Sequence, residues 1–191
     1  NDTYFDVSEL TRVKDNGARA AVRAIAEQAR VDLCFGAQPI LLGGGFDLNH
    51  ADDTERRKAI DAVKAGVDQA EELGCKGVAV LSGKATGDTE GAMLLLIDSL
   101  KQLAGYAKSK GMPLVLETFD QVPFGKNCLI GPNADAVVVS KEVRKEYPDF
   151  GIMLDLSHLP LQFEASAEAI ATAGAHLVHA HIGNCAMDDP T

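Results

Sequence analysis

Residues 151–158 read G-I-M-L-D-L-S-H: an apolar run ends in the carboxylate of Asp155, and a histidine follows three residues later. Two other segments are built in a similar way, M-P-L-V-L-E at 112–117 and L-V-H-A-H at 177–181. Apolar runs of this length and composition are typical of buried strands. We therefore predict three strands that each end in a polar side chain, and in a parallel sheet such ends lie along one edge.

Apolar runs of this kind alternate with amphipathic segments along the whole chain. We expect strands at residues 4–9, 31–38, 77–82, 113–119, 151–156 and 176–182. We expect helices at about residues 17–29, 54–73, 89–109, 133–146 and 164–173. The clearest helix is the second, in which apolar residues recur every three or four positions, with Asp52 as its expected cap and Gly74 as its expected stop.

Repeated strand–helix units without a hairpin signal favour an α/β fold, either a (β/α)8 barrel or an open doubly wound sheet. A doubly wound nucleotide-binding protein carries a glycine-rich turn that joins its first strand directly to a helix. In this chain the three glycines at 43–45 fall within a long expected loop at 39–53, well before the next expected helix. We interpret this segment as a flexible loop rather than a phosphate-binding turn.

The composition excludes several classes of protein. The 191 residues are 46% apolar and 24% charged, which is ordinary for a globular domain and excludes a disordered chain. The formal net charge of −10, from 28 acidic and 18 basic side chains, argues against a protein that coats nucleic acid. The longest apolar stretch, residues 92–97, is far shorter than the roughly 20 residues of a membrane-spanning helix. We expect neither nucleic acid nor a membrane as a partner.

The cysteines indicate the compartment of the protein, and the two ends of the chain indicate how much of the domain is present. The cysteines at 34, 75, 128 and 185 are scattered and form no C-x-x-C motif, so we interpret them as reduced thiols of a cytoplasmic protein. The chain begins without methionine, enters an expected strand almost at once and stops shortly after another. We therefore expect residues 1–191 to form a single domain that is incomplete at both ends.

Glu117, Asp155 and His181 are the candidates for a metal site at the common edge. A carboxylate in such a position is costly to desolvate unless it is paired, hydrogen-bonded or bound to a cation. Two carboxylates and a neutral imidazole suit Mn²⁺, Mg²⁺, Co²⁺ or Zn²⁺. Taken singly, Glu117 also fits a loop-anchoring acceptor and Asp155 a helix cap. His158 is placed to reach the same mouth, and alternation along the strand puts His179 one layer deeper, as a core or supporting histidine.

Three motifs, L-E-T-F-D at 116–120, M-L-D-L-S-H at 153–158 and H-A-H-I-G-N at 179–184, resemble those of the xylose isomerase-like TIM-barrel superfamily, and within it the sugar phosphate isomerase/epimerase branch. The resemblance implies a (β/α)8 TIM barrel of which this chain supplies strands 2–7, whereas strands 1 and 8 have no counterpart. It also implies one divalent metal ion, Mn²⁺ first, with Mg²⁺, Co²⁺ or Zn²⁺ as alternatives. The implied ligands are Glu117, Asp155 and His181, and the family's fourth ligand, a Glu on strand 8, has no counterpart here.

The function that this resemblance implies is a metal-dependent isomerase or epimerase of a sugar or sugar phosphate, assembled as a homodimer or homotetramer. Glu117, as general base, would remove a proton next to the substrate carbonyl while the metal stabilises the resulting enediolate. His158, the second catalytic candidate, would orient a substrate hydroxyl. Glu9 is expected to line the mouth, and Lys126 is the local cation for a phosphate or carboxylate group of the substrate.

Two departures from the pattern of ketose 3-epimerases widen the choice of activity. The residues after the H-x-H motif, N-C-A-M at 184–187, include no arginine, and Asp120 stands where a second glutamate is usual. The alternatives are an inosose dehydratase-like lyase and a catalytically inactive sugar-binding barrel. A further alternative, an endonuclease IV-like AP endonuclease, needs additional histidines at the ends of strands 2–4, where this chain has Glu9, Gln38 and Ser82.

Overall fold

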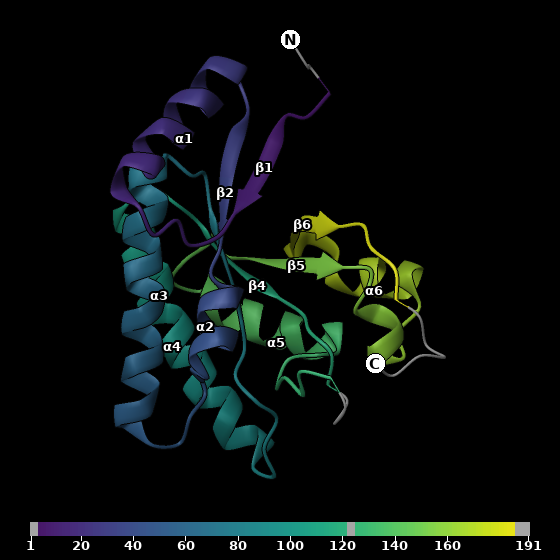
Figure 1. Ribbon diagram of the computed structural model, residues 1–191. Coiled ribbons are helices and arrows are strands. Elements are labelled where there is room, and N and C mark those ends of the chain that lie inside the picture. The colour runs from purple at the N-terminus through teal and green to yellow at the C-terminus, as the bar shows by residue number, and fades with distance from the viewer. Residues whose placement is uncertain (1–3, 122–124, 186–191) are drawn as a thin grey trace.

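Six parallel strands form one sheet whose spatial order follows the chain, β1-β2-β3-β4-β5-β6. The computed structural model describes residues 4–121 and 125–185. The strands are β1 (Val7–Leu10), β2 (Asp32–Gly36), β3 (Val78–Leu81), β4 (Leu114–Glu117), β5 (Gly151–Asp155) and β6 (Leu177–His181). Figure 1 shows the strand direction turning steadily from β1 and β2 to β5 and β6, so that the sheet curves. The fold is therefore a partial (β/α) barrel, which confirms the predicted class and the predicted place of all six strands.

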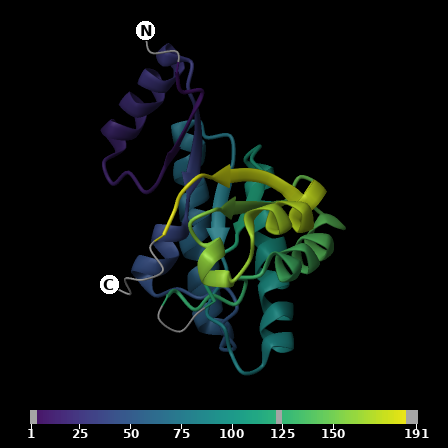
Figure 2. The same ribbon diagram turned by 90° about the vertical axis from the view of Figure 1, so that its right-hand side faces the viewer.

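Helices cover the outer, convex face of this sheet (Figures 1 and 2). The helices that connect successive strands are α1 (Asn16–Ala29), α3 (Asp53–Leu73), α4 (Thr89–Ser109), α5 (Asn133–Arg144) and α6 (Ser166–Ala173). Short 3-10 turns lie at η1 (Leu159–Gln162) and η2 (Gly174–His176). Among the described residues, no helix is both long and apolar enough to cross a membrane.

The helix α3 shows why the sequence pattern placed these elements correctly. Its buried face includes Ile60, Val63 and Val67, which lie three or four residues apart and pack toward the sheet. The helix begins where the Asp52 carboxylate accepts hydrogen bonds from the backbone of Thr54 and Glu55 at 2.8 and 3.2 Å. It ends at Gly74, whose left-handed φ of 75° a residue without a Cβ adopts readily. Both predicted boundaries are confirmed to within one residue.

The central strands are buried on both faces. Every residue of β3 and β4 is buried, as expected for parallel strands between two layers. One side of the sheet packs on the helices, and on the other side Ala79, Val115 and Met153 form a small apolar cluster inside the barrel. Polar side chains at the carboxyl ends of the strands therefore lie directly above a packed apolar cluster.

The segment 39–53, expected to be a loop, is partly helical. Helix α2 (Gln38–Gly44) follows β2 after a single residue, has Pro39 in its first turn and ends at Gly45 with a left-handed φ of 63°. Proline is tolerated in the first turn of a helix because the backbone N–H groups of that turn have no carbonyl partner within the helix. Seven residues are too few to show a clear helical period, so the sequence pattern missed the helix. The consequence is functional, because α2 holds Gln38 over the ends of the neighbouring strands.

Candidate metal centre

Glu117, Asp155 and His158 meet at the carboxyl ends of β4 and β5. Glu117 is the last residue of β4, Asp155 is the last residue of β5, and His158 lies in the turn that follows. One ligand atom from each of the three side chains lies within 4.8 Å of the other two. The strand ends thus bring together two carboxylates and an imidazole, as the edge of a parallel sheet predicts.

Glu117 is almost completely buried, with 3% of the residue exposed. Its Oε2 accepts a hydrogen bond of 2.7 Å from Gln38 Nε2, from the start of α2. Burial, the largest cause, and the charges of Asp155 and Glu9 together raise the pKa of Glu117 to about 8, although the hydrogen bond from Gln38 acts to lower it. A carboxyl with this pKa exchanges a proton near neutral pH, which is the property of a general base.

Asp155, unlike Glu117, has a pKa below its ordinary value. Burial raises its pKa, but hydrogen bonds to Oδ1 from the Ser157 hydroxyl at 2.7 Å and the Ser157 backbone at 2.8 Å, with the charges of His158 and His181, bring the pKa below its ordinary value. Asp155 Oδ2 remains available on the side of His181, whose Nδ1 lies 3.8 Å away. Neighbouring carboxylates with separated pKa values are typical of catalytic sites.

His158 is fixed by the loop that follows β4. Its Nδ1 lies 3.3 Å from Asp120 Oδ1, and its ring lies against that of Phe119, with centroids 4.0 Å apart. Asp120 is itself buried and accepts a hydrogen bond from the backbone N–H of Lys126. Burial lowers the pKa of His158, so the neutral imidazole is favoured, with Nε2 left for a ligand.

A second group of side chains lies next to the first, on the two edge strands. Glu9 Oε2 of β1 is 3.3 Å from His181 Nε2 and 3.7 Å from His179 Nε2, both on β6. These three side chains also offer ligand atoms within 4.8 Å of one another. Glu9, His179 and His181 are each more exposed than Glu117 or Asp155.

The three predicted ligands are therefore divided between the two groups: Glu117 and Asp155 belong to the first, and His181 belongs to the second. Asp155 connects them, because it lies close to Glu117 on one side and to His181 on the other. Lys126 is exposed in the loop after β4, and its charge contributes to lowering the pKa of His158. Sequence patterns missed one residue that contacts the centre, Gln38, because the helix that carries it was not predicted.

The donor set fits a divalent cation. Glu117 and Asp155 lie together and form no ion pair with a lysine or arginine of residues 4–121 and 125–185. Two adjacent carboxylates without a cation repel each other, and the charge of Asp155 adds to burial, the larger cause, in raising the pKa of Glu117. Carboxylate oxygens and imidazole nitrogens are the ligands that Mn²⁺, Co²⁺ and Zn²⁺ accept. Glu117, Asp155 and His181 or His158 would hold such an ion.

The model of one protein family, described as the xylose isomerase-like TIM barrel, matches residues 4–188 of this chain. The chain belongs to the xylose isomerase-like TIM-barrel family. This assignment agrees with the curved parallel sheet and with the polar residues at the ends of β4, β5 and β6.

Individual members of this family are similar to the chain over part of their length. A D-psicose 3-epimerase of Ruminiclostridium cellulolyticum is 29% identical over 100 residues, which are 52% of this chain and 32% of that protein. A crystal structure of D-psicose 3-epimerase with D-tagatose, from Clostridium cellulolyticum H10, superposes with a TM-score of 0.80 and 22% identity, over 95% of this chain and 64% of that one. A structure described as an AP endonuclease, family 2, from Brucella melitensis gives a TM-score of 0.73 and 18% identity, over 93% and 68%. The chain thus spans less than two thirds of the length of these epimerases.

Proposed function

We propose that this chain carries the core of a divalent-metal-dependent sugar isomerase or epimerase. The observation that carries the proposal is the pair Glu117 and Asp155: these carboxyl groups are adjacent on neighbouring strand ends, Glu117 is buried and Asp155 half-buried, and the pKa of Glu117 is raised whereas that of Asp155 is lowered. The similarity to a D-psicose 3-epimerase supports a ketose as the substrate class. Mn²⁺ is the preferred ion, with Mg²⁺, Co²⁺ and Zn²⁺ as alternatives, because carboxylate and imidazole donors suit all four.

Glu117 is the proposed general base. Glu117, Asp155 and His181 would hold a divalent cation, which would supply Lewis acidity for the substrate carbonyl and so make the neighbouring C–H group more acidic. Glu117 takes the proton from that carbon, and Gln38 keeps its carboxylate oriented by the hydrogen bond to Oε2. The raised pKa of Glu117 makes it a stronger base than an exposed glutamate, provided that the pH is high enough to ionise it.

His158 is the proposed hydroxyl-binding residue. Asp120 on its Nδ1 side fixes the orientation of the ring, and the favoured neutral state leaves Nε2 to exchange a hydrogen bond with a substrate hydroxyl. Glu9 would line the opposite side of the mouth. Lys126, exposed at the rim, would neutralise an acidic group if the substrate carries one.

The alternative activities make different demands on the same strand ends. An inosose dehydratase-like lyase uses the same proton abstraction and differs in the group that leaves. An endonuclease IV-like enzyme needs histidines after β1, β2 and β3, but there Gln38 is engaged by Glu117 and Ser82 accepts a hydrogen bond from the Ile130 backbone. Sugar chemistry is therefore favoured over phosphodiester hydrolysis. An inactive sugar-binding barrel would not need a buried base of raised pKa.

The setting of the protein is also part of the proposal. We place it in the cytoplasm, because the thiols of Cys34, Cys75 and Cys128 are free and reduced cysteines are typical of that compartment. We expect a homodimer or homotetramer, to be measured by light scattering on the full-length protein.

The proposed function is tested by proton exchange in heavy water. The full-length protein is stripped of metal, supplied with Mn²⁺ and incubated with D-psicose in D₂O. We expect conversion to D-fructose with deuterium incorporated at C3, and no conversion in the metal-free sample. Turnover that does not depend on a divalent ion, or no exchange at C3 of any ketose tested, would contradict the proposal.

A further inference from the structure

Glu9, His179 and His181, the edge group, bring three metal-ligating side chains together at the two ends of the sheet. Glu9 belongs to β1 and both histidines belong to β6, the first and last strands in the sheet order (Figure 1). His179 and His181 are two residues apart, so they share one face of their strand. Glu9 Oε2 lies 3.7 Å from His179 Nε2 and 3.3 Å from His181 Nε2. The reaction proposed for Glu117 gives His179 no role.

The spacing of the three ligand atoms fits one tetrahedral zinc ion. With Zn–N and Zn–O bonds of about 2.0–2.2 Å, neighbouring ligand atoms of a tetrahedral site lie about 3.4 Å apart. The two distances to Glu9 Oε2, 3.3 and 3.7 Å, are close to this value, and all three ligand atoms lie within 4.8 Å of one another. Two histidines and one glutamate are also a ligand set of zinc enzymes, in which water takes the fourth position.

Glu9 has no permanent cation beside it. Within residues 4–121 and 125–185, its ion-pair partners are the two histidines, and no lysine or arginine forms an ion pair with it. A histidine is a cation only when it is protonated. The side chains of Glu9, His179 and His181 are 26, 33 and 35% exposed, and a cavity of about 160 Å³ borders Glu9 and His179. A metal ion from solvent therefore has access to this carboxylate and its two imidazoles.

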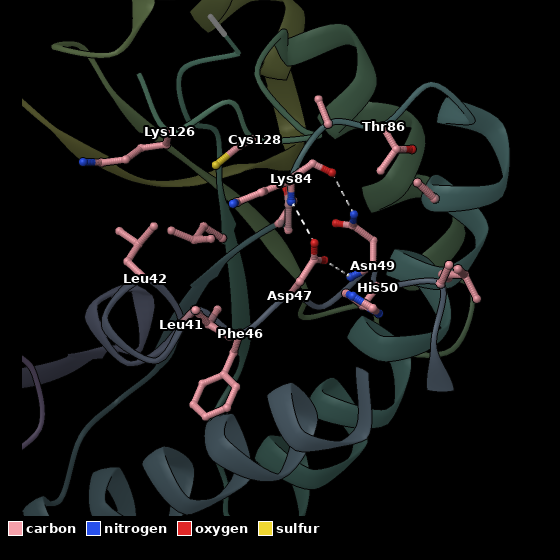
Figure 3. A pocket seen from close by; sticks show the side chains of 18 of the residues that line it. Leu41, Leu42, Phe46, Asp47, Asn49, His50, Lys84, Thr86, Lys126 and Cys128 are labelled. Carbon is pink, nitrogen blue, oxygen red and sulfur yellow. Dashed lines mark hydrogen bonds between the residues drawn. The ribbon is translucent and has the colours of Figure 1, made fainter. Parts of the chain in front are cut away.

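A larger cavity, of about 690 Å³ over the carboxyl end of β3, gathers no such ligand set (Figure 3). Its carboxylate Asp47 is engaged, because it accepts hydrogen bonds from the backbone of Asn49 at 2.8 Å and of Lys84 at 3.2 Å. In the described part of the chain, three ligand side chains come within 4.8 Å of one another only at the metal centre and at the edge group. A second cation is therefore expected at the edge group rather than in this cavity.

His181 stands between the edge group and the metal centre. Its Nε2 lies 3.3 Å from Glu9 Oε2, and its Nδ1 lies 3.8 Å from Asp155 Oδ2. A neutral imidazole has one nitrogen with a free lone pair and one nitrogen that carries a hydrogen, so it ligates one ion at a time. An ion held by Glu9 and His179 through Nε2 of this ring therefore takes His181 from the centre.

The two groups also differ in the metal that they favour. The centre offers the two carboxylates of Glu117 and Asp155 beside one imidazole, and carboxylate-rich sets suit Mn²⁺. The edge group offers two imidazoles beside one carboxylate, and imidazole suits Zn²⁺, which also binds a given set of ligands more tightly than Mn²⁺ does. Zn²⁺ is thus the ion expected at the edge group, and Mn²⁺ the ion expected at the centre.

We propose that Glu9, His179 and His181 form an inhibitory zinc site, which takes His181 from the metal centre when Zn²⁺ is bound. The ligands are Glu9 Oε2 and the Nε2 atoms of both histidines, with water in the fourth position. The centre then holds its own ion less tightly, so turnover falls as the Zn²⁺ concentration rises. The inhibition rests on the proposed function, whereas the binding of Zn²⁺ does not.

Two substitutions of histidines three residues apart form a matched pair. His179→Asn removes one zinc ligand, whereas His176→Asn removes a histidine that contacts Ser140 at 2.9 Å and belongs to neither ligand group. Each full-length protein is loaded with Mn²⁺ and titrated with Zn²⁺, by calorimetry for binding and by ketose turnover for inhibition. Glu9→Gln repeats the binding measurement from the other strand, should His179→Asn fail to fold. Cys34→Ser tests the thiol that lines the same small cavity.

We expect His179→Asn to raise both the Kd for Zn²⁺ and the Zn²⁺ concentration for half inhibition about tenfold or more, and His176→Asn to change neither. Glu9→Gln is expected to weaken zinc binding by a similar factor, and Cys34→Ser to leave it unchanged. These results together would support the zinc site.

Equal zinc binding or equal inhibition in His179→Asn and the unaltered protein would place the ion elsewhere and overturn the inference, as would loss of zinc binding in Cys34→Ser. Zinc binding that leaves turnover unchanged would overturn the inhibitory role. If no ketose is turned over, the proposed function fails, and zinc calorimetry still decides. Weaker binding in His179→Asn but not in His176→Asn then supports the site, and no zinc binding by the unaltered protein refutes it.

Discussion

Glu117 and Glu9 are both acidic side chains near the carboxyl ends of barrel strands, yet the protein surrounds them differently. Glu117 belongs to β4, which has a strand on each side, and it is 3% exposed and hydrogen-bonded to Gln38. Glu9 belongs to the edge strand β1, its side chain is 26% exposed, and its partners are two histidines of the other edge strand, β6. The interior half of the rim is thus fixed by packing, whereas the edge half is fixed only by contacts between side chains.

This difference suggests that the two pairs of residues contribute unequally to the proposed reaction. Burial raises the pKa of Glu117, whereas hydrogen bonds from Ser157 hold the pKa of Asp155 below its ordinary value. Carboxylates with separated pKa values of this kind are typical of acid–base catalysis. On the edge side, Glu9 and His181 contact each other at a partly exposed position, where solvent weakens interactions between polar groups. Chemistry is therefore expected to depend most on the interior half.

The largest expected effect is that of Glu117→Gln. The amide keeps the shape of the side chain but cannot accept the substrate proton, so kcat falls about 1,000-fold, within the range for general acid–base catalysis. The matched change Glu9→Gln on the edge half is expected to lower kcat about tenfold or less. The measurement is kcat of both variants by steady-state kinetics, with their metal content determined in parallel. An equal loss of kcat in the two variants would contradict the distinction between the interior and edge halves.

His158→Asn is expected to have the next largest effect. It removes the imidazole that Asp120 orients, so kcat/KM falls about 100-fold through lost contact with a substrate hydroxyl. His176→Asn is the control, because His176 Nδ1 contacts Ser140 Oγ at 2.9 Å, away from the rim. A loss of bound metal in His158→Asn that matches the loss of activity would instead make His158 a ligand.

Gln38→Leu is expected to have a smaller effect. The substitution removes the hydrogen bond to Glu117 and leaves a side chain of similar size, so the base is less well oriented and kcat falls about tenfold with little change in KM. Because this hydrogen bond lowers the pKa of Glu117, its loss also moves the acid limb of the pH–rate profile to higher pH. An unchanged profile would show that Gln38 does not position the base.

The sequence alone predicted the architecture well because its signals are local. The three- and four-residue spacing of Ile60, Val63 and Val67 predicts α3, and the apolar runs before Glu117 and Asp155 predict the strand ends. Short α2 gave no period, and so the partner of Glu117 could not be found from the pattern.

The detailed grouping of the site also needed the structure. Alternation along a strand tells which residues share a face, but it does not tell how neighbouring strands are aligned. The register between β5 and β6 shifts at Ile152 and Met153, and this shift places Asp155 opposite His181. For the same reason, the pattern could not show that His158 lies closer to the pair of carboxylates than His181 does.

The most direct test is to locate the metal ion. A crystal structure of the full-length protein, grown with Mn²⁺ and recorded at the manganese absorption edge, would show the ion by its anomalous signal. We predict one strong peak at the ends of β4, β5 and β6, coordinated by Glu117, Asp155 and His181. A peak held by Glu9 and His179 without Glu117, or no peak at these strand ends, would contradict the assignment of the metal centre.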